Sequence, residues 1–474
     1  MENFDISTLL ARLETESIEF SVSEKSRFDA SLDHMRYSFM PSVVVYAKSQ
    51  ADIQKLLKNC NELNIPVSVR GAGTGCAGGC VPICNEIVLD VSAINFIEID
   101  PVSRIAHVGA GAITADIDAQ AKKFGLFYAP DPSSHKFSSI GGNIACNAGG
   151  LRALKYGTTR ENLVALKAVL PSGEVITGGL PLKKYSVGLN LRDIFVGSEG
   201  TLGVISQAWL KLLPLPKTKS VSLAFFSSDS DAVVGVEKIM QAKLTPAVFE
   251  FMDCDTIACV RKRNADLPIP EGTSALIAEF DGNESETSAQ AKKFFDTLDG
   301  FAVEIKIADG EEMEKLWKVR RSASQSMYEL GDSKISQDIV LPHNAVVEFF
   351  DYYKKLGETM NLATPTFGHV GDGNYHIHFM YDSADSSARG RASDAMDLAI
   401  KKAVELGGAV SGEHGIGFLK SKYMSLQHSQ VELDLMKSLK KVFDPNNILN
   451  RGKVFESYDT KNLAPLKNIK VPWD

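Results

Sequence analysis

Three glycine-rich stretches near the start of the chain constrain its fold more than any other feature. They are Arg70–Gly75, Ile140–Gly150 and Gly197–Ile205. A glycine-rich turn at the end of a strand exposes consecutive backbone N–H groups, which can bind a pyrophosphate. The second stretch is rich in Gly and small residues and contains two Asn, a composition that suits a backbone lying flat against a planar ligand. We therefore predict that a large dinucleotide lies across all three stretches.

The surrounding sequence alternates between strand-like and helix-like segments. Residues 5–16 and 51–63 have helical spacing of apolar side chains, and residues 41–46 and 66–70 are strand-like. Residues 80–89 are predicted to be loop and strand, so no helix follows Gly75, and a nicotinamide-binding Rossmann site is disfavoured. Beyond residue 216 a second α/β domain is predicted. Its expected strands are 220–226, 247–252, 275–280 and 302–307, and its expected helices are 231–242 and 285–298.

Histidines gather in two short motifs late in the chain. Gly368–His378 predicts two strands joined by a turn at 370–374, which places His369 and His376 on facing strands. His378 shares a strand face with His376, and it is either a third ligand or a supporting or surface residue. A single His in a strand is more often a core or surface residue than a ligand. Four of the nine His fall in these two motifs, which favours a functional site.

The second motif, Ser411–Gly417, supplies Glu413 and His414. Two imidazoles and a carboxylate are a typical ligand set for a divalent metal, with zinc expected first and manganese or iron as alternatives. We predict that His369, His376 and Glu413 bind this metal. His414, beside the carboxylate, is predicted to act as a general base.

Composition excludes several classes of protein. A chain of 474 residues predicts two or three domains, and a net charge of −8 argues against a nucleic-acid partner. No apolar run reaches the length of a membrane span, and no signal peptide is visible, so a cytoplasmic protein is expected, peripheral at the inner membrane only through a partner. Seven Cys without a Cys-x-x-Cys pair predict neither a disulfide framework nor an iron–sulfur centre.

Taken together, the three glycine-rich stretches and the motifs at 368–376 and 412–417 resemble one known family. It is the FAD-linked 2-hydroxy acid dehydrogenase branch of the vanillyl-alcohol oxidase/para-cresol methylhydroxylase superfamily, and the resemblance covers roughly residues 35–455. It implies an α+β fold. The expected parts are an N-terminal helical segment (1–35), a PCMH-type FAD-binding domain (36–215), a ferredoxin-like α/β cap domain (216–410) and a C-terminal segment that returns to the FAD domain (411–474).

The resemblance also implies which residues bind FAD. No His lies in Arg70–Gly79, so non-covalent FAD is expected, with Cys76 and Cys146 as the remaining candidates for a thioether link. The implied FAD-binding residues are Arg70, Gly71, Ala72, Gly73, Thr74, Gly75, Pro130, Ser133, Gly141, Gly142, Asn143, Ala145, Gly149, Tyr156, Gly157, Glu199, Gly200, Leu202, Gly203, Ile205 and Asn450.

The chemistry implied by the resemblance is oxidation of a small D-2-hydroxy acid to the 2-oxo acid, with hydride transfer to flavin N5. Arg320 is expected to bind the substrate carboxylate, with Arg321 as the alternative, and Asn374 to hold the substrate or the flavin edge. Ser336 stands where relatives that act on dicarboxylates are expected to have Lys, which favours glycolate or D-lactate.

Four alternatives stay open. They are a D-2-hydroxyglutarate-type dehydrogenase, a non-catalytic FAD-binding subunit of a dehydrogenase complex, a lipid-type transferase that uses FAD without net redox, and a metallohydrolase without flavin. The implied partners are the 2-hydroxy acid and an external electron acceptor, which is a quinone, a cytochrome, an electron-transfer flavoprotein or an iron–sulfur subunit. A homodimer is a further expected assembly.

Overall fold

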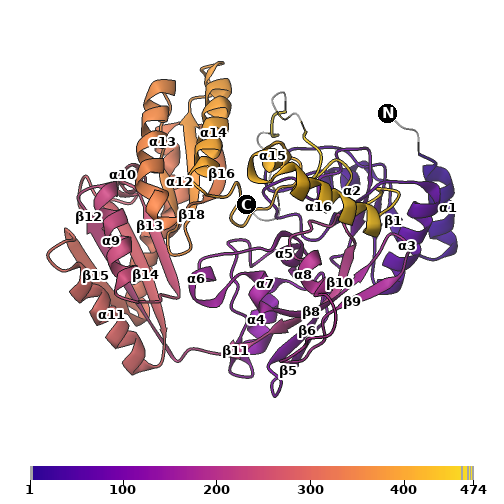
Figure 1. Ribbon diagram of the computed structural model, residues 1–474, viewed down its shortest axis with the longest axis horizontal. Helices are drawn as coiled ribbons and strands as arrows, with labels where there is room; N and C mark the ends of the chain where they lie inside the picture. The colour runs from indigo at the N-terminus through magenta and orange to yellow at the C-terminus, as the bar shows by residue number, and fades with distance from the viewer. Residues whose placement is uncertain (1–3, 459, 461–462, 467–468, 470, 472–474) are drawn as a thin grey trace. The chain divides into compact units, whose positions relative to one another are not determined.

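The computed structural model describes residues 4–458, 460, 463–466, 469 and 471, and the chain divides into two compact units (Figure 1). Unit 1 is formed by the described parts of residues 1–149, 157–215 and 413–474. Unit 2 is formed by residues 150–156 and 216–412. Each unit is therefore discontinuous in sequence. Among the described residues, no helix combines the length and apolar character that crossing a membrane requires.

The first sheet of unit 1 has four strands in the order β1-β2-β4-β3. β2, β4 and β3 pair in parallel, and β1 pairs with β2 in the antiparallel direction. Helix α3 begins at a capping box made by Ser49 and Asp52, and it buries Ile53, Leu56 and Leu57 in the core of the unit. The elements of this part are α1 (Ile6–Thr15), β1 (Glu19–Ser21), α2 (Glu24–Asp29), β2 (Val44–Tyr46), α3 (Gln50–Leu63), β3 (Val67–Arg70) and β4 (Ile87–Asp90).

A second sheet of unit 1 has five antiparallel strands in the order β5-β6-β10-β8-β9. Its strands are β5 (Ile97–Asp100), β6 (Ile105–Gly109), β8 (Leu163–Val169), β9 (Val175–Gly178) and β10 (Val204–Lys211), while β7 (Leu126–Phe127) pairs with β11 (Leu213–Pro214). The helices of this part and of the chain end are α4 (Thr114–Lys122), α5 (Ile140–Cys146), α7 (Thr159–Asn162), α8 (Leu191–Phe195), α15 (Met424–Gln427) and α16 (Gln430–Phe443).

The prediction that the backbone lies flat over Ile140–Gly150 is wrong for its first seven residues. They form helix α5, which buries Ile140 and Ile144 at i and i+4 against the core of unit 1. The helix ends at Asn147, whose left-handed φ of 53° stops further helical hydrogen bonding. The small residues therefore allow helix α5 to pack closely, as Gly141 does against Ala110.

Unit 2 contains one seven-stranded sheet in the order β15-β12-β14-β13-β17-β18-β16, and every pairing in it is antiparallel. The first part, with strand order β15-β12-β14-β13 and helices α9 and α11 as connections, has the expected ferredoxin-like arrangement. Helix α10, between β13 and β14, was not predicted. The elements are β12 (Thr218–Phe226), α9 (Asp229–Gln241), β13 (Val248–Met252), α10 (Cys254–Arg263), β14 (Ser274–Gly282), α11 (Glu284–Leu298) and β15 (Glu304–Asp309).

The remaining strands of unit 2 carry the histidine motif. α10 and α12 pack on one sheet face through a shared apolar cluster. α13 packs on the opposite face through Phe350 and Tyr353, and Figure 1 shows α13 and α14 beside β16 and β18. These elements are α6 (Ala153–Tyr156), α12 (Met313–Ser326), β16 (Ser333–Val340), α13 (Val346–Met360), β17 (Thr366–His369), β18 (Asn374–Tyr381) and α14 (Ala388–Glu405).

Candidate active site

A cavity in unit 1 brings the three glycine-rich stretches together. Most residues of the predicted dinucleotide site line it, although the stretches lie far apart in sequence. The predicted residues among the lining are Gly71, Ala72, Gly73, Thr74, Gly75, Ser133, Gly141, Gly142, Asn143, Ala145, Gly149, Glu199, Gly200, Gly203, Ile205 and Asn450. Glu413 and His414 line the same cavity.

Glu199 and Asn450 hold the walls of this cavity in place. The two carboxylate oxygens of Glu199 accept hydrogen bonds from the backbone N–H groups of Ile416 and Gly417, at 2.7 and 2.8 Å. Asn450 accepts from the backbone N–H of Val69 at 2.9 Å and donates to the backbone oxygen of Glu199 at 2.5 Å. Burial raises the pKa of Glu199, and both N–H donors oppose that shift. These contacts tie the first and third glycine-rich stretches to the motif that carries His414.

Five predicted FAD-binding residues are not among the residues that line this cavity: Arg70, Pro130, Tyr156, Gly157 and Leu202. Arg70 instead donates to the backbone oxygens of Leu32 and Asp29, at 2.8 and 3.3 Å, and so supports the turn beneath it. The hydroxyl of Tyr156 donates to Asp281 within unit 2. Their assignment to the cofactor stays a prediction.

Sequence reasoning missed other residues that line the cavity. Several of them come from the segment between residues 132 and 139 and from the segment that directly follows Gly75. These residues include His34, Cys80, Pro132, Ser134, Phe137 and Ser139, while Cys76 and Cys146, the two candidates for a thioether link, also line the cavity. Burial raises the pKa of the Cys146 thiol, so Cys146 is a poor nucleophile.

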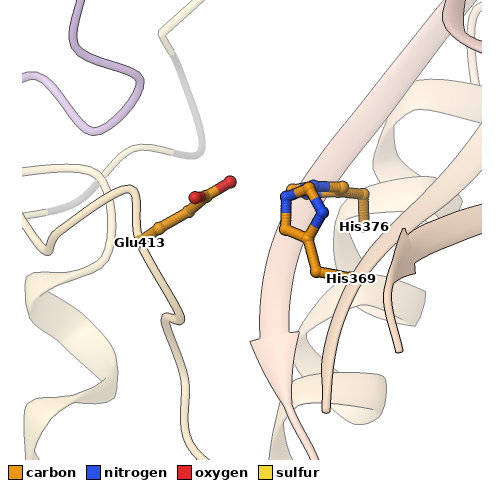
Figure 2. A group of neighbouring side chains, drawn as sticks. All are labelled: His369, His376 and Glu413. Carbon is orange, nitrogen blue, oxygen red and sulfur yellow. The ribbon is translucent and has the colours of Figure 1, made fainter. Parts of the chain in front are cut away.

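The predicted histidine hairpin is present in unit 2. β17 and β18 pair with His369 opposite Asn374 and with Phe367 opposite His376. The Nε2 atoms of His369 and His376 lie 3.4 Å apart, and Figure 2 shows the two imidazole rings, together with Glu413 as the third residue of the predicted metal site. Asp372 and Gly373 form the tight turn that makes this approach possible. A Cβ on Gly373, whose φ is +76°, would lie 2.4 Å from a backbone oxygen.

Glu250, on β13, organises this site and was not predicted. Its Oε1 lies 2.5 Å from Nδ1 of His369, and its Oε2 accepts from Nε of Arg320 at 2.7 Å. The carboxylate is fully buried. Burial raises its pKa, but electrostatic attraction and hydrogen bonds from His369 and Arg320 together outweigh burial, so the net pKa of Glu250 is lowered. A carboxylate on Nδ1 selects the His tautomer whose Nε2 carries a lone pair.

Of the two candidate arginines, Arg320 is the one held at the histidine site. Its guanidinium lies over the ring of Phe367, at 4.3 Å from the centroid, and its side chain is 13% exposed. Arg321 instead pairs with Glu314 on the surface of α12. Within the described chain, the hydrogen bond to Glu250 uses only the Nε of Arg320, and binding of a carboxylate by its planar Nη edge stays a prediction.

The segment that leads to Glu413 is anchored beside the histidine hairpin. The backbone N–H of Gly412 donates to Asp338 at 2.7 Å, and Asp338 lies opposite His376 in the pairing of β16 with β18. A Cβ on Gly412 would lie 2.4 Å from Nδ2 of Asn374, so only Gly fits there. Gly412 is the last residue of unit 2 and Glu413 the next residue of unit 1.

His378 lies on the same strand face as His376, but it is buried and its Nδ1 contacts the backbone oxygen of Pro365 at 3.1 Å. Burial lowers the pKa of His378 well below its ordinary value. This environment fits a neutral supporting histidine.

Comparison with known proteins decides the family. The profile described as "FAD linked oxidases, C-terminal domain" matches residues 215–454, and the profile described as "FAD binding domain" matches residues 41–179. The chain is 37% identical over 433 residues to glycolate oxidase subunit GlcD of Bacillus subtilis (strain 168), which covers 90% of this chain and 92% of that protein. This chain belongs to the FAD-linked oxidases.

A second relative of this FAD-linked oxidase is a D-lactate dehydrogenase of Anaerostipes hadrus, 35% identical over 428 residues, which covers 87% of this chain and 89% of that protein. Among solved structures, p-cresol methylhydroxylase with substrate bound shares the fold, with a TM-score of 0.80 and 16% identity over 95% of this chain and 97% of that chain. The predicted PCMH-type α+β fold is thereby confirmed.

The cavity of unit 1 fits FAD, the cofactor of this family. A Cβ on Gly71 would lie 2.2 Å from Oγ of Ser139, and one on Gly141 would lie 2.8 Å from the Cβ of Ala110, so these positions accept only Gly. A Cβ on Gly75 would meet nothing within 4 Å, because Gly75 borders the open cavity. The Oγ of Ser139 is buried and has no hydrogen-bond partner among the described residues, which leaves a polar group for the cofactor.

The histidine pair fits a divalent metal. Two nitrogen ligands of a tetrahedral zinc ion lie about 3.3 Å apart when each bond is about 2.05 Å long. The Nε2 atoms of His369 and His376 are 3.4 Å apart, and Glu250 supplies the carboxylate that commonly supports a metal-binding histidine. The spacing of these two nitrogens is therefore compatible with a divalent metal, whose binding here stays a prediction.

Proposed function

We propose that this FAD-linked oxidase converts a small D-2-hydroxy acid to the 2-oxo acid, with glycolate and D-lactate as the first candidates, and passes the electrons to an external acceptor. The observation that carries the proposal is the position of Glu413 and His414. Both line the cofactor cavity, and Glu413 directly follows Gly412, which Asp338 anchors beside the histidine hairpin. The names of the two relatives support the substrate class.

The proposal assigns each part of the reaction to the cofactor, the metal or a side chain. FAD, when bound, would accept the hydride from the substrate carbon. A metal held by His369, His376 and Glu413 would supply Lewis acidity and lower the pKa of the substrate hydroxyl.

The side chains of the protein would supply the rest. The Nη edge of Arg320 would bind the carboxylate. The Oδ1 of Asn374 is buried and has no partner within the described chain, so it can accept a hydrogen bond from the substrate. His414 would take the hydroxyl proton.

The test is anaerobic titration of the FAD-loaded protein with a panel of D- and L-2-hydroxy acids. The absorbance of the oxidised flavin is followed during the titration. Bleaching by glycolate or by one D-acid, with no bleaching by its L-enantiomer, is the expected result. A yellow protein that dithionite bleaches but no 2-hydroxy acid bleaches, with metal supplied, would contradict the proposal and favour a non-catalytic FAD-binding subunit. If a 2-hydroxy acid does bleach the flavin, the electron acceptor is sought among quinones, cytochromes, electron-transfer flavoproteins and iron–sulfur proteins.

A second candidate substrate class, 2-hydroxy acids with a distal carboxylate such as 2-hydroxyglutarate, is favoured by Lys334. Lys334, Ser336 and Asp338 point to one face of β16, opposite Met380, His378 and His376. The Oγ of Ser336 is buried without a partner in the described chain. The Nζ of Lys334 lies 3.9 Å from Sδ of Met327 and 5.4 Å from the ring centroid of Tyr328, and it pairs with no carboxylate among the described residues.

Burial lowers the pKa of Lys334 to about 8. A desolvated ammonium without a counterion, in the same row as the residues beside the metal ligands, could bind a second anionic group of the substrate. Successive members of this row are about 6.8 Å apart along the strand, which suits an acid of several carbons rather than glycolate.

The substitution Lys334→Met tests this candidate. We expect kcat/KM for D-2-hydroxyglutarate to fall about 10- to 100-fold, as for loss of a charged hydrogen bond, and kcat/KM for D-lactate to stay unchanged. In the unmodified protein, KM for the diacid should rise as pH increases through about 8, because Lys334 then loses its proton. Lys219→Met, which removes a lysine paired with Glu279 in the same sheet, is the matched control. An equal loss for both substrates would contradict a role in specificity.

A further inference from the structure

Helix α16 exposes apolar side chains and buries a lysine, the reverse of the usual amphipathic pattern. Val431, Leu435, Leu439 and Val442 are 78%, 63%, 36% and 75% exposed. Their spacings of four, four and three residues place them in one stripe along the outer side of the helix. We call these four residues the α16 stripe. On the inner side, Leu433 and Lys440 are buried.

The orientation of α16 is set by strong contacts within unit 1, so rotation of the helix cannot bury the stripe. The Nζ of Lys440 donates to the backbone oxygens of Thr201 and Leu449, both at 2.8 Å, and pairs with Asp444. Phe443 packs edge-on against Phe195, with the ring centroids 5.5 Å apart. A capping box closes the first turn of the helix. These contacts therefore keep the α16 stripe exposed on the surface of unit 1.

Contiguous apolar surface on a folded unit marks a site of association. The charges beside the α16 stripe indicate what associates there. Asp434 lies in the first half of the helix and Lys441 in the second half, and a spacing of seven positions places both on the same flank. Both residues are exposed. The stripe thus carries an acidic end and a basic end.

This arrangement is self-complementary when two copies of the helix meet in the antiparallel direction. Val431 then lies opposite Val442 of the other copy, Leu435 opposite Leu439, and Asp434 opposite Lys441. The midpoints of these three pairs all fall between residues 436 and 438, as one twofold axis requires. We propose that a second copy of this chain binds the α16 stripe and that the protein forms a twofold homodimer through paired α16 helices.

The α16 stripe offers only a small interface. A stable interface buries about 800 Å² on each partner, which is more than one helix stripe provides. Leu426 on the neighbouring helix α15 is a further exposed apolar residue, 42% exposed. The dimer should therefore depend on protein concentration and dissociate on dilution.

Sedimentation equilibrium of the full-length, FAD-loaded protein over a range of concentrations tests the proposal. The expected result is a monomer–dimer equilibrium. Leu435→Glu should weaken it about 100-fold, because twofold symmetry applies the substitution twice in one contact. Val102→Glu, at an 89% exposed apolar residue away from the stripe, is the matched control and should leave the equilibrium unchanged.

Charge exchange tests the antiparallel register itself. Asp434→Lys and Lys441→Asp should each weaken dimerisation, and the double variant should restore it. Unchanged flavin absorbance and circular dichroism show that each variant is folded. A wild-type protein that stays monomeric at every concentration would overturn the proposal. The stripe would then be a surface for another protein or for another part of the same chain. A double variant no better than either single variant would overturn the antiparallel pairing.

Discussion

His414→Gln is expected to lower the rate of flavin reduction by a D-2-hydroxy acid about 100- to 10,000-fold, the usual contribution of a general base. Glutamine cannot accept the hydroxyl proton, although it nearly preserves the size of the side chain. FAD should stay bound, because the glycines, Glu199 and Asn450 that shape the cavity are unchanged. Anaerobic stopped-flow measurement of flavin bleaching gives the rate, and the absorbance spectrum of the variant gives its FAD content.

Two comparisons separate loss of a base from loss of structure. His343→Gln, at an exposed histidine on another part of the chain, should leave the rate unchanged. Imidazole added to His414→Ala should restore part of the rate, because a small base can enter the space left by the side chain. A His414→Gln variant that reduces flavin at the normal rate would assign the proton to another group.

Glu250→Ala is expected to lower metal affinity about 10- to 100-fold, which is the usual effect of removing the support of a metal-binding histidine. Without the carboxylate, His369 loses the contact that selects its tautomer, and Arg320 loses its partner. Breaking a buried ion pair by removal of one member also lowers the free energy of unfolding, by about 3–5 kcal/mol. Metal content after dialysis against a chelator series and urea denaturation measure the two effects.

A matched control is available on the neighbouring strand. Glu279 is also buried on β14 and pairs with Lys219 and Trp317, but no described contact joins it to a histidine. Glu279→Gln should lower stability and leave metal affinity unchanged. Glu250→Gln keeps the shape of the side chain and should keep more of the metal than Glu250→Ala. Equal metal affinity in all three variants would show that Glu250 has only a structural role.

The two histidine motifs illustrate how far sequence reasoning extends. The hairpin of β17 and β18 was predictable because its turn residues and its alternation act over a few neighbouring residues. The helix at Ile140–Cys146 was not, because the same small residues allow either a helix or an extended backbone, and burial of Ile140 and Ile144 in the core decides between them. Local composition is an incomplete guide where packing makes the choice.

The sequence by itself determined the family, the glycine-rich stretches that FAD requires and the spacing of the histidines within one hairpin. Tertiary structure alone decided which distant residues support that hairpin. Glu250 is 119 residues from His369, and the pairing of β13 with β17 brings the two strands together. Asp338 reaches Gly412 across 74 residues, next to the antiparallel bridge between Val340 of β16 and Ala409. A buried acid has no local sequence signal, because its partners come from strand order and register, which depend on the packing of the whole sheet.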